Sequence, residues 1–290
     1  MAINVRKLGH ALGAEVSGVD ISRPIDDQTF SEINRAFLEN CVLVFHDQPL
    51  TREQHVAFSR RFGELDNNLA RSAHMRVPEV PEIFLVTAEP IPPGQTPGGV
   101  IGDDWHTDNS HLPVAAAASL LQAIELPDVG GDTMFCNMYR AYDTLTDGMK
   151  KLIEPLQGVH MQSRAFHDFS TPERAEESWK RFPAASHPAV RVHPESGRKA
   201  LYVNRQVRFF VGMSSAESKP LIDYLTDHAV RPQNVYRHVW KVGDLVMWDN
   251  RCTLHMSLGD FDRTKRRHME RTTVHADRSG YDYRGPIPGH

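Results

Sequence analysis

The stretch Leu245-Val-Met-Trp-Asp-Asn-Arg-Cys-Thr-Leu-His255 contains two short apolar runs separated by a polar turn at Asp249-Asn250. Short apolar runs bounded by turn-forming residues are typical of β-strands. The stretch therefore predicts one strand over Leu245–Trp248, a tight turn, and a second strand over Cys252–His255. On that second strand, His255 and Cys252 point to opposite sides, because side chains alternate along a strand.

The same kind of short run recurs on both sides of this unit. Turn signals at Asp128–Asp132, Glu195–Gly197 and Val242–Asp244 separate the runs. The further predicted strands are Cys41–Phe45, Ala117–Ala123, Thr133–Cys136, Ala200–Asn204, Val235–Trp240 and Arg271–His275. Many short strands with few helices favour a mainly β fold with flanking helices, either a β-sandwich or a jelly roll.

Helical patterns are few, two near the N-terminus and two later in the chain. Apolar residues recur at helical spacing in Asp26–Asn40, after Thr146 and in Ser215–Val230, where Pro220 is expected to kink or restart the helix. Thr51–Phe62 opens with the spacing of a capping box. Residues 89–102 are rich in proline and glycine, and residues 163–185 are polar. We expect one domain over residues 1–290, with loop or lid insertions near 89–102 and 163–185.

Composition and motifs exclude several classes of protein. The 290 residues include 33 basic and 37 acidic side chains, for a net charge of −4, so we expect no nucleic-acid partner and no binding to anionic membranes. No apolar run is long enough to span a bilayer. Three cysteines without a C-x-x-C pair and no signal-peptide pattern suggest a reducing, cytoplasmic location. Motifs of P-loop, Rossmann, zincin and serine-hydrolase enzymes are absent.

Four histidines are followed two positions later by an acidic residue, a spacing that lets both side chains reach one metal ion from a strand. The pairs are His106/Asp108, His193/Glu195, His268/Glu270 and His275/Asp277. The second falls on a turn expected at the surface, the third in a charged run expected to face solvent or salt partners, and the fourth at a fraying strand end. The first follows a proline- and glycine-rich loop, where functional residues tend to occur.

His255 is a candidate third ligand for a metal at His106 and Asp108. Two imidazoles and one carboxylate on one side of an ion leave open positions that suit non-haem Fe(II). Zinc usually recruits a cysteine or a fourth protein ligand, so a zinc site is the alternative. Arg267 and Arg271 follow His255, and a guanidinium can hold a carboxylate through two parallel hydrogen bonds. The competing interpretation is that Lys265–Arg271 is a solvated basic loop.

In combination, these motifs resemble a known family. Trp105–Asp108, Gly130–Thr133, Trp248–Arg251, His255 and the two downstream arginines are similar to motifs of the iron- and 2-oxoglutarate-dependent dioxygenases, in the taurine dioxygenase and phenoxyacetate-herbicide dioxygenase family. The similarity is collinear from Leu12–Asp20 through Phe58–Gly63 to Thr273. It implies a double-stranded β-helix, which is a jelly-roll, cupin-like core.

The resemblance also implies roles for individual residues. His106, Asp108 and His255 would bind Fe(II). Thr133 and Arg267 would hold the distal carboxylate of the co-substrate 2-oxoglutarate. Arg271 would hold the acidic group of the substrate. One extra residue between His255 and the arginines, compared with close relatives, makes Arg266 an alternative to Arg267.

Two positions depart from the taurine enzymes of the family. Asn68 stands where those enzymes have a substrate-binding histidine, and Val207 replaces an aromatic residue of the taurine pocket. The expected substrate is therefore another small anion: a carboxylate such as an aryloxyalkanoate, a different sulfonate, or a sulfate ester. With O₂, the expected reaction is hydroxylation, with possible fragmentation of the product and release of succinate and CO₂.

Two other functions stay open on the sequence. One is a non-catalytic jelly-roll protein that binds metal or acts as a sensor. The other is a zinc hydrolase on the same fold, which would need neither O₂ nor 2-oxoglutarate. By analogy with the family we expect a homo-oligomer, a dimer or tetramer.

Overall fold

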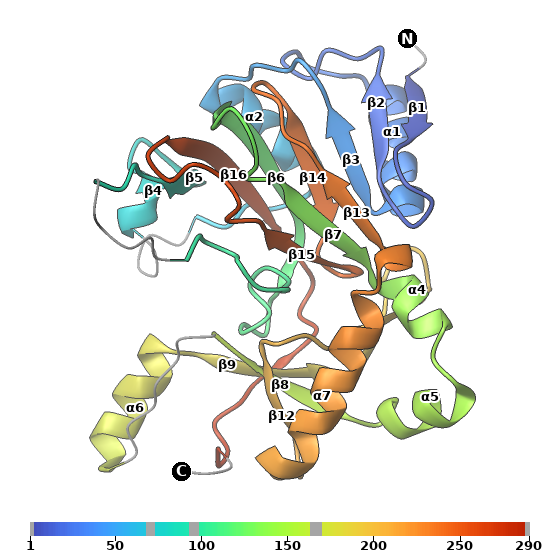
Figure 1. The fold of residues 1–290 in the computed structure, drawn as a ribbon, viewed down its shortest axis with the longest axis vertical. Helices are drawn as coiled ribbons and strands as arrows, with labels where there is room; N and C mark the ends of the chain where they lie inside the picture. Colours follow the sequence, from blue (N-terminus) through green and yellow to red (C-terminus); the bar gives the residue numbers. More distant parts are fainter. Residues whose placement is uncertain (1–2, 68–72, 93–98, 163–169, 288–290) are drawn as a thin grey trace.

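The computed structural model describes residues 3–67, 73–92, 99–162 and 170–287. The fold is mainly sheet with flanking helices, as the sequence predicts (Figure 1). The large sheet has the strand order β1 (Asn4–Lys7), β2 (Ala14–Ser17), β3 (Val42–Phe45), β14 (Leu245–Asp249), β6 (Ala116–Glu125), β16 (Arg267–His275), β5 (Val80–Ala88) and β4 (Arg76–Val77). All neighbouring pairs in it are antiparallel except β2 and β3.

Three smaller sheets complete the strand content of the described residues. One sheet has the order β13 (Val235–His238), β7 (Thr133–Asn137) and β15 (Thr253–Ser257). Another has the order β12 (Val207–Phe210), β8 (Gln157–Met161), β9 (Ala184–Pro188) and β17 (Tyr281–Asp282). The third pairs β10 (Val190–Val192) with β11 (Lys199–Leu201).

The helices cover the outside of these sheets. They are α1 (Asp27–Asn40), α2 (Arg52–Ser59), α4 (Met138–Asp143), α5 (Asp147–Ile153), α6 (Pro172–Arg181) and α7 (Ser215–Ala229), with 3₁₀ turns at Arg60–Phe62, Ala73–Met75 and Pro232–Asn234. Helix α1 packs on β2, β3 and β14, whereas α7 packs on α4 and β12 (Figure 1). In the part of the chain that is described, no helix is both long and apolar enough to cross a lipid bilayer.

The central strands are apolar on both faces because each face meets a different core. On β14, Leu245 and Met247 join a cluster with the helix residues Ile33 and Phe37. The alternate residues of the same strand, Val246 and Trp248, pack on the other side of the sheet, in the cluster that contains Phe135 of β7. This sandwiching explains why a continuous apolar run, rather than an alternating one, forms the strand.

Two sequence expectations need correction. Helix α7 runs from Ser215 to Ala229 with Pro220 inside it, so the helix does not restart there, and a kink, the other expected outcome, stays a prediction. A capping box at Ser214 and Glu217, together with burial of the Ile222 and Leu225 side chains, favours the helix enough to offset the hydrogen bond that proline cannot donate.

The two predicted insertions differ from each other. The described part of residues 89–102 forms neither helix nor strand, as expected. Residues 163–185 contain regular structure, helix α6 and the start of β9, while residues 163–169 lie outside the described part. Helix α6 has only ten residues, most of them polar, so few apolar side chains mark it in the sequence.

Candidate active site

His106 and His255 are joined by their backbones. The N–H of His106 donates to the His255 carbonyl at 3.0 Å, and the N–H of His255 donates to the His106 carbonyl at 2.8 Å. This exchange of both hydrogen bonds makes an isolated antiparallel bridge between the loop before β6 and strand β15. Directly opposite residues of an antiparallel pair project to the same face. The two imidazoles accordingly lie 4.1 Å apart, centroid to centroid.

Asp108 completes the group. His106 Nε2 lies 4.0 Å from Asp108 Oδ1, and His255 Nε2 lies 3.8 Å from Asp108 Oδ2. One potential ligand atom from each residue falls within 4.8 Å of the other two. Asp108 and His255 are buried, while His106 is partly exposed. The structure therefore brings His255 to the pair His106 and Asp108, which it follows by more than 140 positions in the chain.

The imidazole of His106 is oriented for a metal. Its Nδ1 lies 2.8 Å from the carbonyl oxygen of Asp104, an acceptor only, so Nδ1 carries the proton and donates it. The lone pair of Nε2 is left free on the side of Asp108. This is the arrangement in which a metal-ligating histidine is fixed by its second nitrogen. His255 Nδ1 is buried without a hydrogen-bond partner among the described residues.

Gly102 allows the close packing around His106. Its φ is +77°, and a Cβ at this position would lie 2.8 Å from His106 Cε1. The Gly102 carbonyl accepts the N–H of Ser257 at 2.8 Å, which holds the loop on β15. A side chain at residue 102 would therefore displace the imidazole.

Each carboxylate oxygen of Asp108 has its own donor. Ser119 Oγ donates to Oδ2 at 2.7 Å, and Arg271 Nη1 donates to Oδ1 at 2.6 Å. Burial raises the pKa of Asp108, but the positive charge of Arg271 and the nearby imidazoles outweigh it and hold the pKa well below its ordinary range. The pKa of His255 is lowered by burial and by His106. The low pKa values of Asp108 and His255 favour an ionised carboxylate and a neutral imidazole, the forms that bind a metal.

Asn250 connects the surrounding side chains and was not recognised from the sequence as more than a turn residue. Its Oδ1 accepts the backbone N–H of Asp108 at 3.1 Å and the Trp248 Nε1–H at 3.0 Å. Its Nδ2 donates to Ser119 Oγ at 3.0 Å. Ser119 was missed as well. A polar residue in the otherwise apolar run Ala115–Leu121 is the only sequence signal for it.

Arg267 and Thr133 line one cavity together with His106, His255 and Arg271. Arg267 is buried, and its Nε donates to the Gly131 carbonyl at 3.1 Å. Burial lowers its pKa to about 10, which still leaves it charged at neutral pH. Thr133 Oγ1 accepts the Trp240 Nε1–H at 3.0 Å, so its own hydroxyl proton is available to another acceptor.

The other candidate residues lie in different places. Arg266 is turned away from the cavity and pairs with Glu89 and Glu125. Val207 of β12 is buried in the apolar core. Asn68 lies outside the described residues. The interpretation of Lys265–Arg271 as a solvated loop is wrong for its second half, because residues 267–271 belong to strand β16 and pair with both β5 and β6.

A second cavity, of about 420 Å³, adjoins the first at Arg271. Aromatic and apolar walls come from Met75, Phe84, Phe182 and Pro183. Polar and charged residues also line it, namely Asp66, His74, Arg76, Asn109, His111, Gln162 and Arg181. A cavity of this size with an apolar wall and a few charged groups is typical of small-molecule sites.

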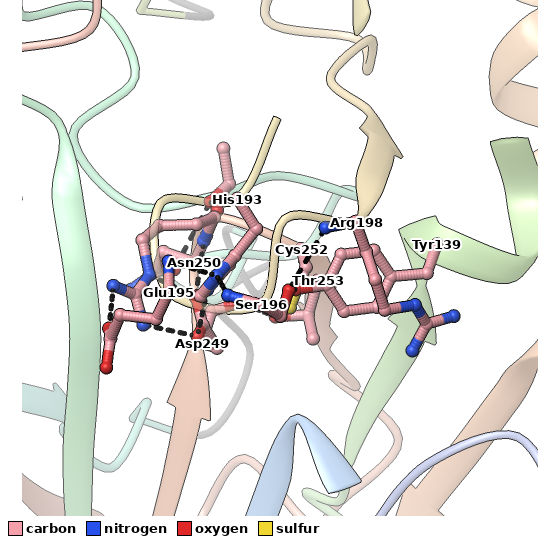
Figure 2. Close-up of polar contacts among 11 residues, drawn as sticks. Tyr139, His193, Glu195, Ser196, Arg198, Asp249, Asn250, Cys252 and Thr253 are labelled. Atoms are coloured by element: carbon pink, nitrogen blue, oxygen red, sulfur yellow. Dashed lines mark hydrogen bonds and ion pairs between the residues drawn. The ribbon is translucent and has the colours of Figure 1, made fainter. Parts of the chain in front are cut away.

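The pair His193/Glu195 was expected on a surface turn, but the His193 side chain is buried. Figure 2 shows its polar contacts. Its Nδ1 accepts the backbone N–H groups of Glu195 and Ser196, so Nε2 carries the proton and donates to Asp249 Oδ2 at 3.0 Å. Because Arg251 also donates to both Asp249 oxygens, the ligand-like group His193, Asp249 and Cys252 is occupied by internal hydrogen bonds.

The pair His268/Glu270 is also buried rather than solvent-facing, although the expected salt partner exists. Two nitrogens of Arg52 in α2 donate hydrogen bonds to the Glu270 carboxylate, and the shortest of these is 2.6 Å. These residues tie α2 to strand β16. His275 is the last residue of β16, so the pair His275/Asp277 lies at the end of this strand, as expected.

The sequence and the structure both match known proteins. Residues 4–273 match the family model described as taurine catabolism dioxygenase TauD, TfdA family. The (S)-phenoxypropionate/alpha-ketoglutarate-dioxygenase of Sphingobium herbicidovorans is 35% identical over 95% of this chain and 96% of its own length. The alpha-ketoglutarate-dependent sulfate ester dioxygenase of Pseudomonas putida is 30% identical over 94% and 90% of the two chains.

Among solved structures, AAD-2 in complex with Mn(II) and N-oxalylglycine superimposes with a TM-score of 0.81 and 32% identity. The match covers 96% of this chain and 100% of that one. Sequence, fold and the grouping of the three ligand-type side chains agree. The chain belongs to the taurine dioxygenase TauD/TfdA family.

Proposed function

We propose that this chain is an Fe(II)- and 2-oxoglutarate-dependent dioxygenase that hydroxylates a small anionic substrate, a carboxylate, sulfonate or sulfate ester. The observation that carries the proposal is the convergence of His106, Asp108 and His255, with ligand atoms within 4.8 Å of one another. Two imidazoles and one carboxylate with open positions suit non-haem Fe(II) oxygenases. The relatives named above are alpha-ketoglutarate-dependent dioxygenases. This similarity favours an enzyme over a non-catalytic sensor.

Ferrous iron held by these three residues supplies the O₂ chemistry that couples decarboxylation of 2-oxoglutarate to hydroxylation of a substrate C–H bond. The protein's own residues do the rest. The Asp104 carbonyl keeps the free nitrogen of His106 turned to the site, and Ser119 and Arg271 hold the Asp108 carboxylate. Rigid placement matters because a displacement of about 1 Å can cost on the order of 100-fold in rate.

The co-substrate is held at its far end by Arg267 and Thr133. The Nε–H of Arg267 donates to the Gly131 carbonyl, so both Nη groups can donate to a carboxylate. The Thr133 hydroxyl, which accepts from Trp240, donates to the same carboxylate. A bidentate guanidinium with an added hydroxyl is a strong carboxylate site. The burial of Arg267 and the ion pairs of Arg266 support Arg267 as the anchor.

The substrate enters from the 420 Å³ cavity and places its anionic group on Arg271. Only Nη1 of Arg271 is engaged by Asp108, and its Nε has no partner among the described residues. The apolar wall formed by Phe84 and Phe182 suits an aryl or alkyl body. Asn68 and Val207 stay predicted contributors to specificity.

Three structural features are part of the same proposal. The large sheet and the β13–β7–β15 sheet form the two walls of a double-stranded β-helix, the jelly-roll core. The chain acts as one domain, residues 1–290, with parts of 89–102 and 163–185 as lids. A dimer or tetramer is the expected assembly.

The test is a succinate-release screen with Fe(II), 2-oxoglutarate and O₂ across aryloxyalkanoates, sulfonates and sulfate esters. The proposal expects succinate formation that depends on one of these substrates, needs O₂, and disappears in His106→Ala. Substrate turnover without O₂ or 2-oxoglutarate would instead support a zinc hydrolase. Retained turnover in His106→Ala would remove that residue from the ligand set.

A further inference from the structure

A cavity of about 800 Å³ lies away from the proposed iron site. It shares no lining residue with the cavity of the His106–Asp108–His255 group or with the adjoining outer cavity. Its wall is formed largely by strand β10, by residues just after β16, and by Ala117 of β6. The reaction proposed above uses none of these residues.

Arg191 of β10 lines this cavity and is only 7% exposed. Its Nη1 is buried without a hydrogen-bond partner, and no carboxylate pairs with the guanidinium in the part of the chain that is described. Its recorded contact is with the ring of Tyr202, 5.0 Å from Cζ to the centroid. A buried charge without a counter-charge is costly, and native proteins avoid it.

The other buried arginines among the described residues show how unusual this is. Arg76 pairs with Asp66, and Arg251 pairs with Asp249 and Glu195. Arg267 lacks a carboxylate too, but it is the proposed anchor for a carboxylate that the co-substrate brings. Like Arg267, Arg191 is buried, lines a cavity and has no carboxylate partner among the described residues.

The neighbours of Arg191 do not neutralise it. Tyr202, His160 and His187 form a cluster with ring centroids 5.2 to 5.5 Å apart. Burial, together with the charge of Arg191, lowers the pKa of both His160 and His187, so these rings are neutral at pH 7. The Tyr202 hydroxyl and both nitrogens of His160 are also buried without partners among the described residues. The cluster offers donors but no negative charge.

The acidic residues of the cavity are already engaged or lie at its mouth. Glu195 is held by Arg251, in the network around Asp249 (Figure 2). Glu64 and Asp277 are exposed at the rim, where water screens their charge. The one exposed arginine of the wall, Arg278, pairs with Asp282. Arg191 is therefore the one buried, unpaired charge of the described wall.

We propose that Arg191 is the anchor of a second anion site, which binds a small oxyanion, an organic carboxylate or an inorganic oxyanion, inside this cavity. The planar guanidinium fork matches two oxygens of such a group. The site is separate from the 2-oxoglutarate and substrate positions, and binding there needs no turnover.

The test measures anion binding with the metal and 2-oxoglutarate positions already filled. The full chain is loaded with Mn(II) and 2-oxoglutarate, and sodium acetate or sodium sulfate is titrated by calorimetry at constant ionic strength. We expect an anion whose binding persists in Arg271→Gln, apart from any anion that Arg271 itself binds. The acetate and sulfate arms show whether the site prefers a carboxylate or an inorganic oxyanion. Arg191→Gln should weaken binding at least tenfold, and Arg191→Lys should give an intermediate loss. Arg278→Gln, in the same cavity, should bind as the unmodified protein does.

Two results would overturn the proposal: no binding of either anion to the loaded protein, or binding that survives in Arg191→Gln and is lost in Arg271→Gln. Should Arg191→Gln fail to fold, crystals of the unmodified protein soaked in bromide decide the question. An anomalous peak beside the Arg191 guanidinium supports the site, and a map without one there refutes it. A normal succinate yield alongside a failed anion test would leave the proposed reaction intact.

Discussion

The backbones of His106 and His255 exchange two hydrogen bonds, at 3.0 and 2.8 Å, although 149 positions separate them along the chain. The bridge sets the distance between two proposed iron ligands without any metal contact. It links the loop that carries Asp108 to strand β15. The site geometry is therefore largely built into the fold, and the following predictions concern the side chains that complete it.

Ser119→Ala should weaken metal binding. The substitution removes the donor to Asp108 Oδ2 and leaves Asn250 Nδ2 without its acceptor. Loss of such a supporting contact typically costs about 10- to 100-fold in metal affinity. Titration of Mn(II), followed by electron paramagnetic resonance, measures it. The matched control is Ser59→Ala, an equally buried serine that bonds Thr272 instead and should leave the affinity within about twofold. Equal losses in both variants would contradict a specific role for Ser119.

Arg267→Gln should raise the KM for 2-oxoglutarate by on the order of 10- to 100-fold, because a charge-assisted, bidentate contact is lost. The matched control is Arg266→Gln, next in the chain but paired with Glu89 and Glu125 outside the cavity. That variant should keep its KM. Steady-state succinate assays with saturating Fe(II) measure both. An increase confined to Arg266→Gln would move the anchor to residue 266.

Arg271→Gln should raise the KM for the primary substrate much more than the KM for 2-oxoglutarate, since Arg271 stands between the triad and the outer cavity. Because Arg271 also holds Asp108, the assay is run at saturating Fe(II), with metal affinity measured in parallel. The opposite pattern of KM changes would exchange the roles proposed for Arg271 and Arg267.

Stability should fall with acid partly through His55 of α2. Burial lowers its pKa from 6.5 to about 4. Below pH 6.5 the unfolded chain takes up a proton that the folded protein refuses until about pH 4. The stability present above this window is lost as pH falls through it, at up to about 1.4 kcal/mol per pH unit for this group.

His55→Gln should reduce the number of protons taken up on unfolding in this pH range by about one, and so make the free energy of unfolding less dependent on pH. Free energies of unfolding from urea titrations, between neutral pH and about pH 4, give the slope. His10→Gln, at an exposed position, serves as the control for deleting a histidine. A slope unchanged by His55→Gln would show that His55 does not carry the effect.

The sequence predicted the strongest local patterns correctly. The capping box at Thr51 and Gln54 is present, and helix α1 falls within the pattern predicted over Asp26–Asn40. The strands around Asp249-Asn250 appear within a residue or two of their expected bounds. Strand β5 was missed, since proline and glutamate near its start break the apolar run. Short edge strands such as β1, exposed along its whole length, carry no hydrophobic pattern to detect.

Only part of the candidate site could be predicted from the sequence, because the rest depends on strand register and tertiary packing. Motif spacing pointed to His106, Asp108, His255 and Arg267, and the family resemblance added Thr133. The structure brings these residues to one region. Motif spacing did not show which of Arg266 and Arg267 faces inward, because that depends on the register of β16. It also placed His193 at the surface. Local sequence marks the turn correctly, but only tertiary packing against Asp249 buries the side chain.

The central claim, that His106, Asp108 and His255 together bind ferrous iron beside 2-oxoglutarate, is tested most directly by anaerobic absorption spectroscopy. Adding Fe(II) and 2-oxoglutarate to the protein should produce a weak visible charge-transfer band. The band should be lost in His255→Ala and kept in His228→Gln, a buried histidine of α7. No band in the unmodified protein, or a band that persists unchanged in His255→Ala, would contradict the account.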